Sequence, residues 1–166
     1  MSIRVREFCD SDIEALTNLY NHYILTTTIT FDITPYTVEQ RKRLWLQHYT
    51  HTGRHRLFVA VADDSPIGYA SSSKLRTKAA YDTSVETSIY LAPEWTGNGV
   101  GCCLYETLFE ALKAQDVHRA YAGITLPNDA SVSIHERFGF ERVGLFREVG
   151  RKFGRYWDVA WFERSL

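Results

Sequence analysis

The chain has 166 residues, 45% of them hydrophobic, with four Trp, ten Tyr and nine Phe, a composition that predicts one globular domain spanning residues 1–166. The 19 Lys and Arg residues against 20 Asp and Glu give a net charge of -1 without any basic run, which argues against nucleic acid as a partner. Apolar stretches are all shorter than the roughly 20 residues that span a bilayer, and the N-terminus lacks the apolar core of a signal peptide, so we expect a cytoplasmic protein with no membrane partner.

The first third of the chain predicts a strand and two helices. Apolar and polar residues alternate from Ile3 to Phe8, which is typical of a strand, and Ser11 with Glu14 predicts a capping box at the start of a helix. The β-branched run at 26–37 predicts a loop or an irregular extended segment. Thr37 and Gln40 then predict a second cap, on a helix that runs through Leu44, Trp45 and Tyr49.

The middle of the chain changes to the period of strands. Residues 57–62 and 67–75 predict a hairpin, with Asp64, Ser65 and Pro66 in its turn. A polar segment separates it from a further strand at 83–91. A glycine-spaced loop follows, and an amphipathic helix is predicted from Val100 to Gln115.

The last third predicts a strand at 118–125, a short helix at 131–138 that ends at Gly139, and two final strands. Some strands follow one another as hairpins and others are separated by helices. The expected fold is therefore α/β or α+β, with a mixed, mostly antiparallel sheet covered by helices on both faces.

The three cysteines, Cys9, Cys102 and Cys103, fit neither a disulfide framework nor a CxxC metal pair. We expect buried, reduced thiols and no metal site.

Glycines 97, 99 and 101 fall on alternate positions just before the helix at Val100. This spacing differs from the dinucleotide fingerprint, and the loop lacks the Lys and the Ser or Thr of a nucleotide triphosphate loop. By itself the loop is consistent with a structural turn or with a backbone cradle for phosphate, because the first amides of a helix have no partner within the helix.

The loop is followed downstream by the segment NDASVSIHERFGF at 128–140. Together they resemble the Gcn5-related N-acetyltransferase (GNAT) superfamily, whose pyrophosphate loop reads Gln or Arg, two residues, Gly, one residue, Gly or Ala. Gly99 and Gly101 match this pattern, while Thr96 replaces the Gln or Arg. Matches to the phosphinothricin acetyltransferase subfamily cover nearly the whole chain and include NHYI at 21–24, AYD at 80–82, VETSIY at 85–90, LYETL at 104–108 and WDVAWF at 157–162.

The resemblance implies a general base, a proton donor and a residue that contacts the pantetheine arm of the cosubstrate acetyl-CoA. Glu86, in the middle of an apolar and hydroxylic strand, would take the proton of the acceptor ammonium, and its alternative is an acid on the solvent face of the strand. His135 would protonate the thiolate of coenzyme A, or else only hydrogen-bond and pack at the pocket. Asn128 would contact the pantetheine, or else only cap a helix.

The same resemblance implies how acetyl-CoA is held. Backbone groups of Ile89, Tyr90 and Leu91 would pair with the pantetheine amides in the manner of an added strand. The pyrophosphate would bind the segment made of Gly97, Asn98, Gly99, Val100, Gly101 and Cys102.

The resemblance also places the small-molecule amine acceptor. The candidates to hold its carboxylate are Lys74, Arg76, Lys78 and Tyr81, with Arg76 preferred because a guanidinium matches a carboxylate bidentately. Phe31 would form an apolar wall. Solvated loop charges and ordinary core packing are the alternatives, and Ser73 stands where the subfamily has Trp.

The expected function is transfer of acetyl to the α-amine of an amino-acid-like acceptor such as phosphinothricin, methionine sulfoximine or methionine sulfone. Acetylation of a peptide N-terminus and a coenzyme A-binding regulatory module without turnover remain open. Relatives of this kind form homodimers, in which the strand with Trp157 and Trp161 would take part.

Overall fold

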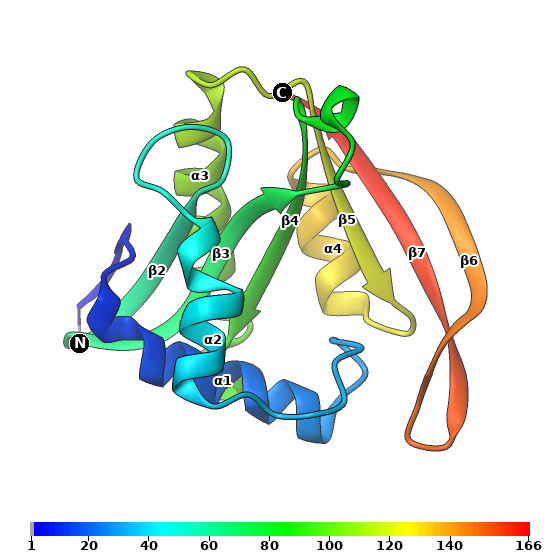
Figure 1. Ribbon diagram of the computed structural model, residues 1–166, viewed down its shortest axis with the longest axis horizontal. Helices are drawn as coiled ribbons and strands as arrows, with labels where there is room; N and C mark the ends of the chain where they lie inside the picture. Colours follow the sequence, from blue (N-terminus) through cyan, green and yellow to red (C-terminus); the bar gives the residue numbers. More distant parts are fainter. Residues whose placement is uncertain (1) are drawn as a thin grey trace.

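A seven-stranded sheet runs through the protein and is covered by helices on both faces (Figure 1). The computed structural model describes residues 2–166. The strand order is β1-β2-β3-β4-β5-β7-β6. The strands are β1 (Ile3–Glu7), β2 (Leu57–Ala62), β3 (Ser65–Lys74), β4 (Ser84–Leu91), β5 (Arg119–Thr125), β6 (Glu141–Lys152) and β7 (Arg155–Ser165), and the helices are α1 (Ile13–Thr26), α2 (Val38–Leu44), α3 (Val100–Lys113) and α4 (Asp129–Arg137).

All neighbouring strands are antiparallel except β4 and β5, which are parallel. This pair is short, because β5 meets β4 only from Ser84 to Glu86. Beyond Glu86 the two strands diverge, and Figure 1 shows them side by side at their beginnings and apart at their ends. Each strand keeps its other partner there, since β4 pairs with β3 up to Leu91 and β5 pairs with β7 up to Thr125. The sheet therefore splits in its middle and leaves one edge of β4 unpaired.

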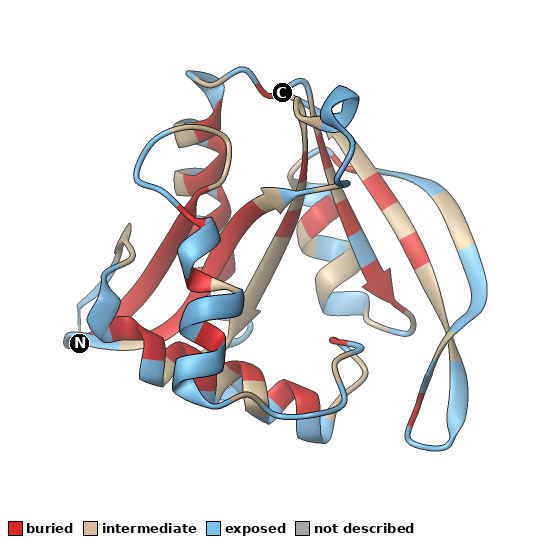
Figure 2. Ribbon diagram, in the orientation of Figure 1, coloured by how far each residue is buried: buried red, intermediate tan, exposed pale blue. Residues whose placement is uncertain are grey.

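The two-residue period of the strands divides the core into two layers. Leu57, Val59 and Val61 of β2 pack with Leu16 of α1, whereas Phe58 and the other alternate residues of β2 pack with α3. Figure 2 accordingly shows β2 buried along its whole length, with α1 and α2 in front of the sheet and α3 and α4 behind it. The mixed, mostly antiparallel sheet with helices on both faces is confirmed.

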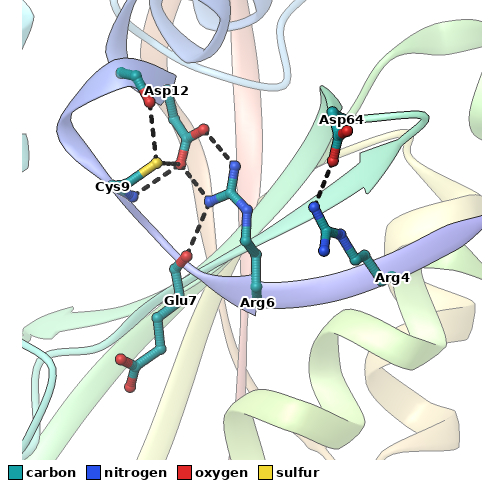
Figure 3. Close-up of polar contacts among 7 residues, drawn as sticks. Arg4, Arg6, Glu7, Cys9, Asp12 and Asp64 are labelled. Atoms are coloured by element: carbon teal, nitrogen blue, oxygen red, sulfur yellow. Dashed lines mark hydrogen bonds and ion pairs between the residues drawn. The ribbon is translucent and has the colours of Figure 1, made fainter.

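The start of α1 differs from the sequence prediction. The capping box of Ser11 and Glu14 does not form, because a 3-10 turn at Asp10–Asp12 precedes the helix. Asp12, 3% exposed, instead accepts two hydrogen bonds of 2.7 Å from the Arg6 guanidinium and one of 2.9 Å from the Cys9 amide (Figure 3). This contact ties β1 to α1. Figure 3 also shows the ion pair of Arg4 with Asp64, which joins β1 to the β2–β3 turn.

The predicted cap on α2 is confirmed. The Gln40 amide donates to the Thr37 hydroxyl at 3.1 Å, and the Thr37 amide donates to the Gln40 side chain at 2.9 Å. The helix is shorter than predicted, because Trp45 leaves the helical backbone region with φ -133° and ψ -59°, and a 3-10 turn follows.

The β2–β3 hairpin is also confirmed, but its turn lies earlier than predicted. Asp63 and Asp64 make the turn with positive φ, while Pro66 already belongs to β3. The expectation of buried thiols was wrong for Cys9 and Cys103, which are exposed, and Cys102 is half-buried; all three are free.

Candidate active site

The larger cavity, of about 480 Å³, lies on the α1 and α2 side of the split in the sheet. Alternate residues of β4, namely Glu86, Ser88 and Tyr90, point into it, as the two-residue period requires. The rest of the lining is mostly aromatic and polar and consists of Tyr20, Arg41, Trp45, His48, Tyr49, His55, Tyr69, Ser71, Ser73 and Lys74. The volume suits a small molecule with a few polar groups.

Glu86 occupies the last position at which β4 still pairs with β5. Its carboxylate makes no hydrogen bond to residues 2–166, although the side chain is half-buried. Burial raises the pKa of Glu86, and the charge of Arg76 lowers it in part. A carboxylate with a raised pKa inside a cavity is suited to take a proton from a bound ligand.

The free edge of β4 offers backbone groups to a ligand. The Ala92 amide donates to the Ile67 carbonyl at 2.8 Å, and the Thr83 carbonyl accepts from His118 of the other neighbouring segment. Since hydrogen-bonding direction alternates along a strand, Ile89 and Leu91 turn their backbone groups toward the split and Tyr90 turns its own toward β3. The Leu91 carbonyl accepts the Tyr23 hydroxyl at 2.6 Å. Ile89 is therefore the best placed of the three predicted pairing residues.

A smaller cavity, of about 50 Å³, lies inside the split between β4 and β5. Asn128 lines it and also caps α4, because its side chain accepts the Ser131 amide at 3.2 Å. Asn128 therefore caps the helix, as the alternative interpretation predicted. Because Asn128 also lines the smaller cavity, its contact with the pantetheine stays a prediction.

His135 also lines the smaller cavity and is 3% exposed. Its Nδ1 lies 2.7 Å from the Ser131 carbonyl, which can only accept, so Nδ1 carries the proton. Its Nε2 lies 2.8 Å from the Tyr105 hydroxyl, which then donates. Burial lowers the pKa of His135, with the Ser131 carbonyl acting in the opposite direction. A neutral imidazole that packs and hydrogen-bonds fits this geometry well, and proton donation by His135 stays a prediction.

The glycine loop ends at α3 with free amides. Gly97 and Gly99 have φ of 77° and 80°, a region that side-chain-bearing residues seldom adopt. The Cys103 amide makes the first bond of the helix, to the Gly99 carbonyl, so the amides of Val100, Gly101 and Cys102 have no helical partner. The loop is exposed, and the Asn98 side chain donates to backbone carbonyls of Glu94 and Thr96. These features suit an anion.

Thr96 stands where the superfamily pattern has Gln or Arg, so this position supplies no cation to the loop. Its hydroxyl donates to the Pro93 carbonyl at 2.7 Å and so stabilises the turn before the glycines. Gly101 lies close to α4, because a Cβ placed there would lie 2.9 Å from Ile134 Cδ1.

The residues predicted for acceptor binding are only partly brought together. Lys74 lines the larger cavity and pairs with Asp82 at 3.3 Å. Arg76 is exposed, with its guanidinium carbon 5.9 Å from the Trp161 ring centroid, yet its charge acts on Glu86. Tyr81 is exposed beside this segment and lines neither cavity.

Phe31 also lies outside both cavity linings. It lies against β6, where a Cβ on Gly150 would be only 2.1 Å from its ring. Its role as a wall of the acceptor pocket stays a prediction.

The sequence interpretation missed two residues, namely Arg41, which lines the larger cavity, and Tyr105, which bonds His135. Arg41 is one of three consecutive basic residues on α2, and such a run is typical of a solvent-exposed face. Its spacing of four from Trp45 was the available signal, because residues four apart share a helix face. Tyr105 stood in a matched segment but has no sequence neighbour that points to His135.

Comparison with known proteins identifies the family to which a chain with this fold and these cavities belongs. The family model described as "Acetyltransferase (GNAT) domain" matches residues 5–161. The chain belongs to the GNAT acetyltransferase family. A phosphinothricin N-acetyltransferase of Streptomyces coelicolor is 55% identical, with 99% of this chain and 96% of that protein covered. An L-methionine sulfoximine/L-methionine sulfone acetyltransferase of Pseudomonas aeruginosa is 31% identical over 100% of this chain and 96% of its own length.

A crystal structure of a GNAT phosphinothricin acetyltransferase from Sinorhizobium meliloti in complex with acetyl-CoA is similar with a TM-score of 0.92 and 30% identity, covering 100% of this chain and 89% of that chain. The GNAT protein described here is an acetyl-CoA-dependent N-acetyltransferase, and acetyl-CoA is its cosubstrate. Within residues 2–166 no group of His, Cys, Asp and Glu side chains is arranged to hold a metal ion, and no helix of that range is long and apolar enough to cross a membrane.

Proposed function

We propose that residues 1–166 act as a single domain that acetylates the α-amine of a small amino-acid-like acceptor of the phosphinothricin, methionine sulfoximine or methionine sulfone type. The observation that carries the proposal is Glu86, an unpaired carboxylate with a raised pKa in a cavity of about 480 Å³ at the split between β4 and β5. The printed names of the Streptomyces coelicolor and Pseudomonas aeruginosa relatives support the class of acceptor.

Glu86 is the proposed general base. An alkylamine with a pKa of about 10 is almost entirely ammonium at pH 7 and cannot attack until it loses a proton. Glu86 takes that proton directly or through water, the amine nitrogen bonds to the thioester carbonyl carbon, and the carbon–sulfur bond breaks. The attacking nitrogen still carries two protons and loses one as the amide forms, and the thiolate of coenzyme A takes one proton, so the charges balance. His135 is the proposed donor to the thiolate.

Acetyl-CoA would lie along the split. The pantetheine pairs with the backbone of β4 at Ile89, with Tyr90 and Leu91 beside it, and passes Asn128. The pyrophosphate lies against the loop from Gly97 to Cys102, where the free amides of α3 supply donors. This path brings the thioester to the end of the split where Glu86 is found.

Acceptor binding is proposed for Lys74 and Arg76, with Tyr81 and Phe31 at the periphery. Lys74 lines the cavity, and Arg76 acts on Glu86 by charge. A carboxylate on the carbon next to the reacting amine would lie near Arg76 when the amine faces Glu86.

A thiol-release assay with purified protein tests the proposal. Free phosphinothricin, methionine sulfoximine and methionine sulfone are compared with short peptides that have free N-termini, each with acetyl-CoA. Turnover of the free amino-acid analogues is expected. Turnover confined to peptides would favour the N-terminal acetyltransferase alternative and contradict the proposal, and binding of acetyl-CoA without turnover of any amine would favour the regulatory module.

We also propose that the protein forms a homodimer through the outer part of the sheet. Apolar side chains on β6 are exposed, with Val143 at 52%, Phe146 at 49% and Val149 at 54%. Trp157 and Trp161 of β7 are half-buried beside them. A second copy would cover these side chains.

A further inference from the structure

Arg41 is a buried cation in the wall of the larger cavity. It projects from α2, is 6% exposed, and lines the cavity together with Glu86. Its guanidinium carbon lies 3.9 Å from the ring centroid of Tyr20 and 3.9 Å from that of Trp45, so the planar group is held between two aromatic faces. The sandwich fixes the orientation of the guanidinium and compensates part of the cost of burying it.

This cation has very few hydrogen-bond partners. Among residues 2–166, its one hydrogen bond is a long one of 3.3 Å from Nη2 to the Tyr69 hydroxyl, and its Nε is buried without a partner. No carboxylate of the described residues lies within 4.0 Å of it. Asp32, a nearby carboxylate, accepts the Tyr20 hydroxyl at 2.6 Å and the Tyr36 hydroxyl at 3.3 Å instead. A guanidinium has five donors and stays charged, so a buried one normally has an anionic partner.

The position of Arg41 separates it from the reacting amine. Its Nη2 bonds the hydroxyl of Tyr69, which pairs with Tyr90 across β3 and β4. Glu86 instead pairs with Ser73, four residues away from Tyr90 along β4. The charge that acts on Glu86 is that of Arg76. A group on the carbon next to the amine would therefore be near Arg76. A group near Arg41 would be on the acceptor's side chain, several bonds from the amine.

We propose that Arg41 is a specificity-determining residue that binds an anionic or strongly accepting oxygen group, such as a phosphinate, at the end of the acceptor's side chain. This inference rests on the proposed function and makes it narrower, because it predicts a preference for amino acids with a side-chain oxyanion over apolar ones of similar length. A bidentate guanidinium contact inside a cavity supplies both affinity and geometry.

The test compares phosphinothricin with norleucine, an apolar amino acid of similar length, in the wild-type protein and in Arg41→Met. The ratio of kcat/KM for phosphinothricin to that for norleucine is expected to fall about 10- to 100-fold in Arg41→Met, the range for a lost hydrogen bond to a charged group. Arg43→Met is the matched control, because Arg43 is an exposed residue of the same helix, and it should keep the wild-type ratio. Equal loss for both acceptors would mean that Arg41 only supports the packing of Tyr20 and Trp45, and would overturn the inference.

Arg41→Lys guards against a variant that fails to fold, since it retains the charge and should retain more of the phosphinothricin preference than Arg41→Met. Calorimetric titration with phosphinothricin alone gives a readout without turnover, and its Kd should rise by the same factor in Arg41→Met. No binding to the wild type, or an unchanged Kd in Arg41→Met, refutes the role of Arg41. Binding that depends on Arg41 without acetyl transfer would instead refute the proposed function, and transfer that does not depend on Arg41 would refute this inference alone.

Discussion

Replacing Glu86 with Gln removes the proposed base and preserves the shape of the cavity. The carboxylate has no hydrogen-bond partner among residues 2–166, so the amide of Gln disturbs no existing contact. About one alkylamine molecule in a thousand is neutral at pH 7 when its pKa is about 10. A variant without a base depends on that fraction, so kcat/KM should fall by about 10³, which corresponds to about 4 kcal/mol in the barrier and lies within the usual range for general base catalysis.

The pH profile gives a second signature of the same change. Burial raises the pKa of Glu86, so wild-type activity should be lost as the pH falls through that raised value and the carboxylate becomes protonated. The activity of Glu86→Gln should instead rise about tenfold per pH unit between pH 7 and pH 9, because the neutral amine increases by that factor. The affinity for acetyl-CoA should not change, since Glu86 does not line the smaller cavity in the split.

Initial rates of thiol release with phosphinothricin between pH 5 and pH 9 measure both effects. Glu106→Gln is the control, because Glu106 is an exposed residue of α3 that lines neither cavity. Full activity of Glu86→Gln at pH 7, or a pH profile parallel to that of the wild type, would refute the assignment of the base.

Two further predictions concern stability and assembly. Asp12→Asn should lower the free energy of unfolding by about 2 kcal/mol at pH 7, less than for a fully buried pair because Arg6 is partly exposed. Burial raises the pKa of Asp12, but the hydrogen bonds from Arg6 and Cys9 outweigh it and hold that pKa below its ordinary value. The stabilisation is therefore present above the ordinary carboxyl pKa and is lost as the pH falls through the lowered one. Urea denaturation that gives the same difference in unfolding free energy between wild type and Asp12→Asn at pH 7 and at pH 3 would contradict this prediction. By light scattering, the wild type should have twice the mass of one chain. Val149→Asp, which places a charge on the exposed face of β6, should have the mass of a single chain. A monomeric wild type would rule out the proposed homodimer.

Local patterns were enough to predict most elements of the fold. The alternation in β2 and β3, the helical spacing of α3, and the cap formed by Thr37 and Gln40 all appear in the structure, because each depends on residues close in sequence. The prediction failed at the start of α1, where Arg6 of the preceding strand takes Asp12 as its partner. That contact depends on how two elements meet.

The candidate site shows the same division. Glu86 and the glycine loop were found from sequence, because a lone acid in a strand and alternate glycines before a helix are local signals that the family resemblance explained. The pairing of His135 with Tyr105 across two helices could not be found in this way. The same holds for Arg41, whose basic neighbours on α2 gave it the pattern of a solvated surface.

The sequence by itself was enough to recognise the resemblance to GNAT enzymes, which implied the family, the cosubstrate and the proposed base, because the motifs that carry the resemblance are continuous segments of the chain. The tertiary structure decided which charged side chains line the larger cavity. Tyr81 and Phe31 do not line this cavity, whereas Arg41 lies in its wall against Tyr20 and Trp45. The physical reason is that burial and charge pairing depend on how α1, α2 and the sheet pack against one another, and no short stretch of the chain encodes that packing alone.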